Sequence, residues 1–135
     1  MSIKLMLDTN ICIYIINRKP PYIAEKFSRY EIGDIGISNI TACELAFGVE
    51  KSGSAKNKTA LTKFLAPLSI LPFDKQAIWH YARIRQSLQN RGTPIGALDM
   101  LIASHALALD ITLVTNNTKE FERVDGLMLD NWVID

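Results

Sequence analysis

Cysteine is scarce in this sequence: its 135 residues include only Cys12 and Cys43. Two cysteines are too few for a disulfide framework, and no cluster of cysteine and histidine has the spacing of a zinc site. We therefore expect Cys12 and Cys43 to be small apolar residues of the core, in a protein that works in a reducing compartment.

Long apolar runs are missing as well. The apolar residues near the N-terminus stop at Asp8, before the run reaches the length of a signal-peptide core. No later stretch approaches the roughly 18 apolar residues that are needed to cross a bilayer. These absences argue against a secreted or membrane-bound protein, and we expect a cytoplasmic one.

Neither sign of charge is in large excess, because the formal net charge is +1. The hydrophobic share of 48% and the charged share of 21% are typical of a folded globule, and the length suits one domain over residues 1–135. Two stretches are basic and contain no acid: residues 51–63 hold four lysines, and residues 83–91 hold three arginines. Each is best interpreted as a solvated helix face, unless a site for a polyanion lies between them.

Short apolar runs alternate with helical patterns along the chain. The runs predict buried strands at residues 3–7, 35–40, 69–73 and 111–115 and an edge strand at 128–134. Helices are predicted at 9–16, 23–30, 75–90 and 97–109, together with a pair that opens at Thr41, breaks at Gly53 and ends near Ala66. This alternation predicts a three-layer α/β/α fold, with helices on both faces of a parallel sheet of four to five strands.

Four acidic residues stand near strand ends in this layout. Asp8 follows the first strand and Glu120 follows the fourth, whereas Glu44 and Asp99 lie in the first turns of two predicted helices. Sites in such folds form beyond the carboxyl ends of the strands. We therefore expect Asp8, Glu44 and Glu120 to converge there, joined by Asp99 if its helix also begins at that edge.

Each of these acids also has a structural interpretation. Asp8 can cap a helix, Glu44 can close a capping box with Thr41, and Asp99 can complement a helix dipole. However, Asp8 follows a buried run, and neither Asp8 nor Asp99 has a basic neighbour in the sequence. Clustered carboxylates cost several kcal/mol unless they are protonated or neutralised, and an all-oxygen cluster favours Mg²⁺, with Mn²⁺ as a substitute.

Four segments resemble, in order and spacing, the PIN domains of VapC toxins. They are residues 6–11 (MLDTNI), 41–45 (TACEL), 94–99 (PIGALD) and 115–121 (TNNTKEF). The resemblance runs from end to end and implies a single PIN domain over 1–135. It implies a magnesium- or manganese-dependent endoribonuclease, the toxin of a type II toxin–antitoxin system, held inactive by a VapB-type antitoxin. We also expect a homodimer.

The resemblance assigns roles to particular residues. Asp8, Glu44 and Asp99 correspond to the acids of the family, with Asp8 and Asp99 as the metal ligands. The supporting hydrogen-bonding positions are Thr9, Asn10, Thr115 and Asn117. Many relatives carry Asp where Asn117 stands, so Glu120 is the candidate for the fourth acid. The sequences of residues 94–96 and 115–121 resemble those of the VapC subgroup that cleaves initiator tRNA.

Two other functions remain open on the residues alone. A phosphatase with Asp8 as its nucleophile is one, although that chemistry usually needs a second Asp where Asn10 stands. A non-catalytic PIN-like module that only binds RNA is the other. The lone histidines His80 and His105 are predicted to be structural or solvent-facing. The aromatic residues Trp79, Tyr81 and Trp132 are predicted to pack in the core or in an interface.

Overall fold

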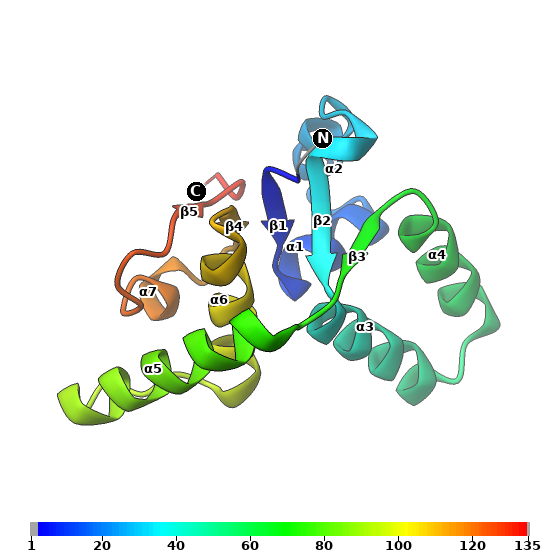
Figure 1. Cartoon of the computed structure of the whole chain (residues 1–135). Helices are drawn as coiled ribbons and strands as arrows, with labels where there is room; N and C mark the ends of the chain where they lie inside the picture. The colour runs from blue at the N-terminus through cyan, green and yellow to red at the C-terminus, as the bar shows by residue number, and fades with distance from the viewer. Residues whose placement is uncertain (1–2, 135) are drawn as a thin grey trace.

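The computed structural model describes residues 3–134 and contains a five-stranded parallel sheet with the order β3-β2-β1-β4-β5 (Figure 1). The strands are β1 (Leu5–Leu7), β2 (Ile35–Ser38), β3 (Ser69–Leu71), β4 (Thr112–Val114) and β5 (Leu129–Asp130). The predicted parallel sheet is confirmed, and each strand is shorter than its apolar run. Because β1 lies at the centre, the residues that follow it stand in the middle of the sheet edge.

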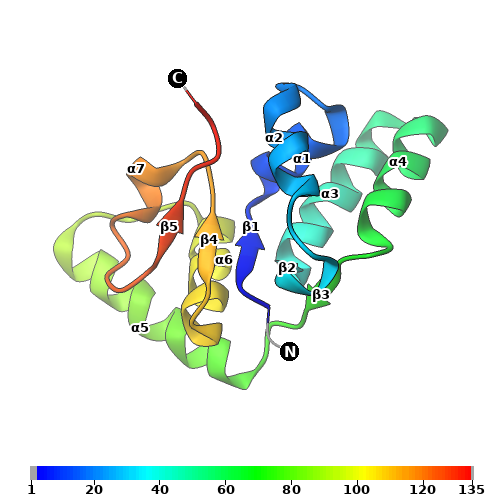
Figure 2. The same cartoon turned by 90° about the horizontal axis from the view of Figure 1, so that it is seen from above.

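Helices cover both faces of the sheet, as the sequence predicts. Figure 2 shows α1 to α4 on the opposite side of β1 from α5 and α7. The helices are α1 (Thr9–Asn17), α2 (Pro21–Ser28), α3 (Asn39–Ser52), α4 (Ala55–Leu65), α5 (Lys75–Arg91), α6 (Ala97–Leu109) and the short α7 (Thr118–Phe121), with a 3-10 turn at Ile32–Asp34. Within residues 3–134, no helix combines the length and the apolar character that crossing a membrane requires.

Two apolar cores lie on the two faces of the sheet. Met6 and Leu113 pack with α5 and α6, whereas their neighbours Leu7 and Val114 pack with α1 to α4. All four side chains are fully buried. Successive residues of a strand point to opposite faces, so a central strand with helices on both sides needs a continuous apolar run. This requirement explains why β1 and β4 show no alternation of apolar and polar residues.

The start of α3 differs from the prediction. Ser38, rather than Thr41, caps this helix, because its side-chain oxygen accepts a hydrogen bond from the Ile40 amide at 3.1 Å. Thr41 is fully buried inside the helix. The predicted capping box between Thr41 and Glu44 is therefore wrong, and Glu44 lies in the second turn of α3 rather than the first.

The two cysteines have different environments. Cys12 is buried in the core on the α1 side, as predicted, whereas Cys43 is exposed. The buried residues of α3 are Thr41 and Leu45, and a position midway between them points away from the core. The prediction that Cys43 belongs to the core is therefore wrong. Trp132 is buried as predicted, while Trp79 is 66% exposed on α5.

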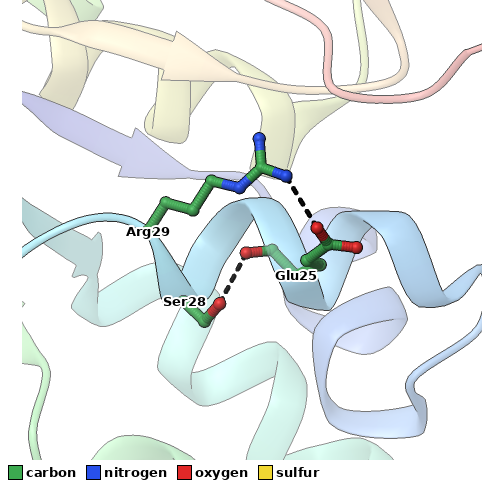
Figure 3. A network of polar contacts seen from close by, with 3 residues as sticks. All are labelled: Glu25, Ser28 and Arg29. Carbon is green, nitrogen blue, oxygen red and sulfur yellow. Dashed lines mark hydrogen bonds and ion pairs between the residues drawn. The ribbon is translucent and has the colours of Figure 1, made fainter.

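Polar contacts on the outer surface of the helices are local. Figure 3 shows one of them on α2, where the Arg29 guanidinium lies 2.6 Å from the Glu25 carboxylate and the Ser28 hydroxyl donates to the Glu25 carbonyl. Both charged side chains of this pair are largely exposed. Such exposed pairs typically contribute less than about 1 kcal/mol. The acids at the strand ends have very different surroundings.

Candidate active site

Asp8 is fixed by hydrogen bonds at the centre of the sheet edge. It caps α1, is only 5% exposed, and its Oδ1 accepts a hydrogen bond from the Thr9 amide at 2.8 Å. Its Oδ2 accepts a hydrogen bond from the hydroxyl of Thr115 at 2.8 Å. Thr115 is fully buried and directly follows the neighbouring strand β4. The ends of β1 and β4 together therefore determine the orientation of this carboxylate.

Glu44 reaches the same edge from α3. Its Oε1 accepts a hydrogen bond from the Thr9 hydroxyl at 2.8 Å, so Thr9 contacts Asp8 through its backbone and Glu44 through its side chain. Asn10, the next residue, is exposed, and no hydrogen bond of its side chain occurs within residues 3–134. Of the two predicted supporting residues on α1, the structure brings Thr9 to the acids and leaves Asn10 at the surface.

Glu120 turns toward α6 rather than toward the solvent. Its Oε1 accepts a hydrogen bond from the Gly96 amide at 2.7 Å, and its Oε2 accepts one from the side-chain amide of Asn117 at 2.5 Å. The backbone N–H of Asn117 donates to the Thr115 hydroxyl at 2.9 Å. These contacts join α7 and the end of β4 to the beginning of α6.

Asp99 lies in the first turn of α6, close to Glu120. A Cβ added at Gly96 would meet Asp99 Oδ2 at 3.2 Å and Glu120 Oε1 at 3.6 Å. The glycine thus lets both carboxylates approach the start of the helix. Sequence reasoning missed this role of Gly96. The signal available was a glycine that directly precedes a predicted helix with an acid in its first turn.

The charges of the four acids act on one another. Burial, followed by the negative charges of Glu120, Asp8 and Glu44, raises the pKa of Asp99 to about 7. Burial also raises the pKa of Asp8, against the hydrogen bonds from Thr115 and Thr9. The Gly96 amide, and also the Asn117 side chain, lower the pKa of Glu120. The four carboxylates therefore form one electrostatic cluster.

No basic side chain pairs with these acids within the part of the chain that the structure describes. The ion pairs there join Lys4 with Asp34, Arg29 with Glu25, and Arg91 with Asp125. Arg123 donates to the Pro94 carbonyl at 2.9 Å and acts on Glu120 only through its charge, which helps to lower the pKa of that carboxyl. The negative charge of the cluster is left for a ligand to neutralise.

The donor set fits a hard divalent cation. Its groups are carboxylates and hydroxyls, which suit Mg²⁺ or Mn²⁺ and do not suit zinc or copper. Among residues 3–134, no three acidic, histidine or cysteine side chains stand close enough together to hold one ion jointly. Magnesium commonly uses one or two carboxylates and retains several waters, so a site for it does not require three such side chains.

The two histidines lie apart from these acids. His105 on α6 is buried, and its Nδ1 lies 2.8 Å from the Ser38 hydroxyl. Burial lowers the pKa of His105, and its contact with Ser38 ties α6 to the N-cap of α3. His80 contacts the carbonyl of Gln76 within α5 at 2.9 Å. Both therefore serve the structure, as their isolation in the sequence predicts.

Comparison with known proteins identifies the family. The PIN domain family matches residues 5–127. The tRNA(fMet)-specific endonuclease VapC of Salmonella typhimurium is 41% identical over 131 residues, which cover 96% of this chain and 98% of that protein. The chain belongs to the VapC family of PIN-domain ribonucleases.

Further VapC proteins support the same assignment. Ribonuclease VapC2 of Rickettsia felis is 43% identical over 132 residues, which cover 94% of this chain and 96% of that protein. The crystal structure of Rickettsia felis VapBC2 bound to a promoter DNA fragment matches with a TM-score of 0.90 and 41% identity, and covers 97% of this chain and 100% of that one. The VapC resemblance and the three-layer fold that the sequence predicts are both confirmed.

Proposed function

We propose that this VapC-family chain is a toxin that hydrolyses RNA phosphodiester bonds with Mg²⁺, with initiator tRNA as its substrate. The observation that carries the proposal is the cluster of four acids, in which burial and then the charges of Glu120, Asp8 and Glu44 raise the pKa of Asp99 to about 7. The substrate is suggested by the Salmonella relative, whose name specifies tRNA(fMet). We further propose that it acts as a single PIN domain over residues 1–135, in a homodimer in the cytoplasm.

In this mechanism, Asp8 and Asp99 would hold the cation, and Glu44 and Glu120 would complete or orient its surroundings. When bound, the cation activates water and offsets the charge that develops on the phosphate. Thr115 and Thr9 hold the Asp8 and Glu44 carboxylates in place. Asn117 and the Gly96 amide hold Glu120. The polypeptide itself supplies no nucleophile.

The proposed function is tested by incubating the purified chain with RNA. We expect cleavage in the presence of Mg²⁺ and none after chelation of the metal, and sequencing of RNA 5′ ends from cells that express the chain alone should give the cut position. Retention of RNA without cleavage, equally with and without magnesium, would identify a binding module. A phosphorylated enzyme trapped by acid would identify a phosphatase that uses Asp8.

Glu120→Gln should raise the Mg²⁺ concentration for half-maximal cleavage by roughly ten-fold, because the cluster loses one negative charge. Thermal stability should change little. A glutamine can keep the bond to the Gly96 amide, and a flipped Asn117 side chain can accept from its amide group. Glu122→Gln is the matched control, since it removes the same charge from an exposed residue nearby. An unaltered magnesium requirement in Glu120→Gln would show that Glu120 does not belong to the site, which would then contain three acids.

The partner we propose is a VapB-type antitoxin, which the co-crystallised VapB of the Rickettsia felis structure supports by analogy. A cavity of about 550 Å³ lies between α1, α3 and α4, with Glu44 at its rim. Its apolar lining includes Ile13, Ile16, Leu45, Val49 and Leu61, and Lys56 adds a positive charge. These features suit a segment that folds on binding and directs an Arg toward the carboxylates.

A further inference from the structure

A second, smaller cavity of about 190 Å³ lies between α5, α6 and the loop that follows α7. Its floor is apolar and includes Ile84, Leu107 and Val124, while Arg83, Ser87 and Arg91 lie around its rim. The two arginines belong to the basic stretch of residues 83–91, which the acid cluster does not explain. Guanidinium groups contact phosphates through charge-assisted hydrogen bonds, and an apolar lining can pack against the base of a nucleotide.

The two rim arginines differ in what they contact. One guanidinium nitrogen of Arg91 donates to the Arg123 carbonyl at 2.6 Å, and another lies 3.6 Å from Asp125, the acid that lines the same cavity. Arg91 thus forms part of the wall and offsets the Asp125 charge. Arg83 is exposed, and no hydrogen bond or ion pair of its side chain occurs within residues 3–134. It is therefore the charge at this rim that remains available to an anion.

Short contacts connect this cavity to the acid cluster. Arg91 contacts the carbonyl of Arg123, and the Arg123 side chain donates to the Pro94 carbonyl at 2.9 Å. Two residues after Pro94, the Gly96 amide donates to Glu120. Val124 and Asp125, which line the cavity, follow Glu120 by four and five residues. Five residues of extended chain span at most about 18 Å, so one strand of RNA can reach both the cavity and the acids.

We propose that this cavity binds an unpaired nucleotide of the RNA substrate that flanks the cleaved bond. Arg83 would contact a backbone phosphate, and the apolar floor would receive the face of a base. The volume admits one ring system and no helix, which favours a single-stranded nucleotide over a protein segment. The inference rests on the proposed ribonuclease function, and it adds a substrate contact outside the acids.

The test compares Arg83→Gln with Arg85→Gln. Both changes remove one positive charge from the exposed side of α5, but Arg85 lies two residues away and donates to the Tyr81 hydroxyl. Binding of a short unstructured oligoribonucleotide is measured by fluorescence anisotropy over a range of salt concentrations, in an Asp99→Asn background to prevent cleavage. Cleavage by each arginine variant is measured with Asp99 intact.

Arg83→Gln should weaken binding about five-fold and lower the slope of log affinity against log salt by about 0.7, the change for one lost contact to a single strand. KM should rise with kcat retained. Arg85→Gln should match the parent chain. Equal effects of the two variants, or no effect of Arg83→Gln on the salt slope, would overturn the proposal. If the parent chain cleaves RNA, such results would overturn the nucleotide site and leave the proposed ribonuclease function standing. A parent chain that neither binds nor cleaves RNA would refute both the nucleotide site and the ribonuclease function.

Discussion

Asp8→Asn and Asp99→Asn should each lower the rate of RNA cleavage by about a hundred-fold or more, while the chain remains folded. Asparagine caps a helix about as well as aspartate, so Asp8→Asn keeps an oxygen for the Thr9 amide. What each variant loses is one negative charge in the cluster. The measurement is the initial rate of cleavage at saturating Mg²⁺, with circular dichroism as the check on folding.

Asp74→Asn is the matched control for these variants. Asp74 also caps a helix, since its Oδ1 accepts a hydrogen bond from the Ala77 amide at 3.2 Å, but it lies apart from the four acids. Its variant should cleave RNA at the parent rate. If both cluster variants also cleave at the parent rate, Asp8 and Asp99 are helix caps and the site assignment is wrong.

Thermal melting across pH gives an independent measure of the same cluster. The pKa of Asp99 is about 7 in the folded chain and has an ordinary value of 3.8. Between these pH values the folded chain retains a proton that the unfolded chain has lost, so stability falls as the pH rises. Without metal, the melting temperature of the parent chain should therefore fall more than that of Asp99→Asn between about pH 5 and about pH 8.

Gly48→Phe should weaken inhibition by the antitoxin and leave RNA cleavage intact. Gly48 lines the larger cavity, and a Cβ added there meets nothing within 4 Å, so a phenylalanine projects into the space proposed for the partner. We expect the antitoxin to bind roughly ten-fold more weakly or worse, since overpacking an apolar contact costs about 1–3 kcal/mol. Inhibition is measured by titrating a VapB-type antitoxin into a cleavage assay.

Gly48→Ala is the control for this substitution. It tests the removal of the glycine without filling the cavity, and alanine favours the helix by about 1 kcal/mol. The alanine variant should be inhibited as the parent chain is. Full inhibition of Gly48→Phe by the antitoxin would exclude this cavity as the docking site.

The order of the elements follows from the sequence with few errors, because apolar runs and helix breaks are local signals. The continuous run at Leu5–Leu7 predicts a strand covered on both faces, and Gly92 ends α5 in the left-handed conformation, with φ of 68°. The first turn of α3 was misplaced because Ser38 and Thr41 are both good caps. Ser38 caps the helix, and its oxygen also contacts His105, which is 67 residues away. A contact over such a separation has no local signal in the sequence.

The candidate site also has features with a local signal in the sequence and features that depend on distant contacts. The four acids were predicted from their positions after strands and at helix starts, since these positions meet at one edge of a parallel sheet. The hydrogen-bond partners of these acids are harder to predict from the sequence. The bond from Thr9 to Glu44 joins residues 35 positions apart, and that from Gly96 to Glu120 joins residues 24 apart. The exposure of Asn10 depends on the rotation of α1, which the motif alone does not reveal.

The hydrogen bond between Asp8 and Thr115 spans 107 residues, and β1 stands between β2 and β4 in the sheet. A chain emerging from the ribosome therefore contains its first acid long before the hydroxyl that orients it. Until β4 has paired with β1, the carboxylates that precede and follow them in the sequence remain apart. We therefore expect the nascent chain to gain ribonuclease activity, and to need the antitoxin, only after β4 and Thr115 have been synthesised.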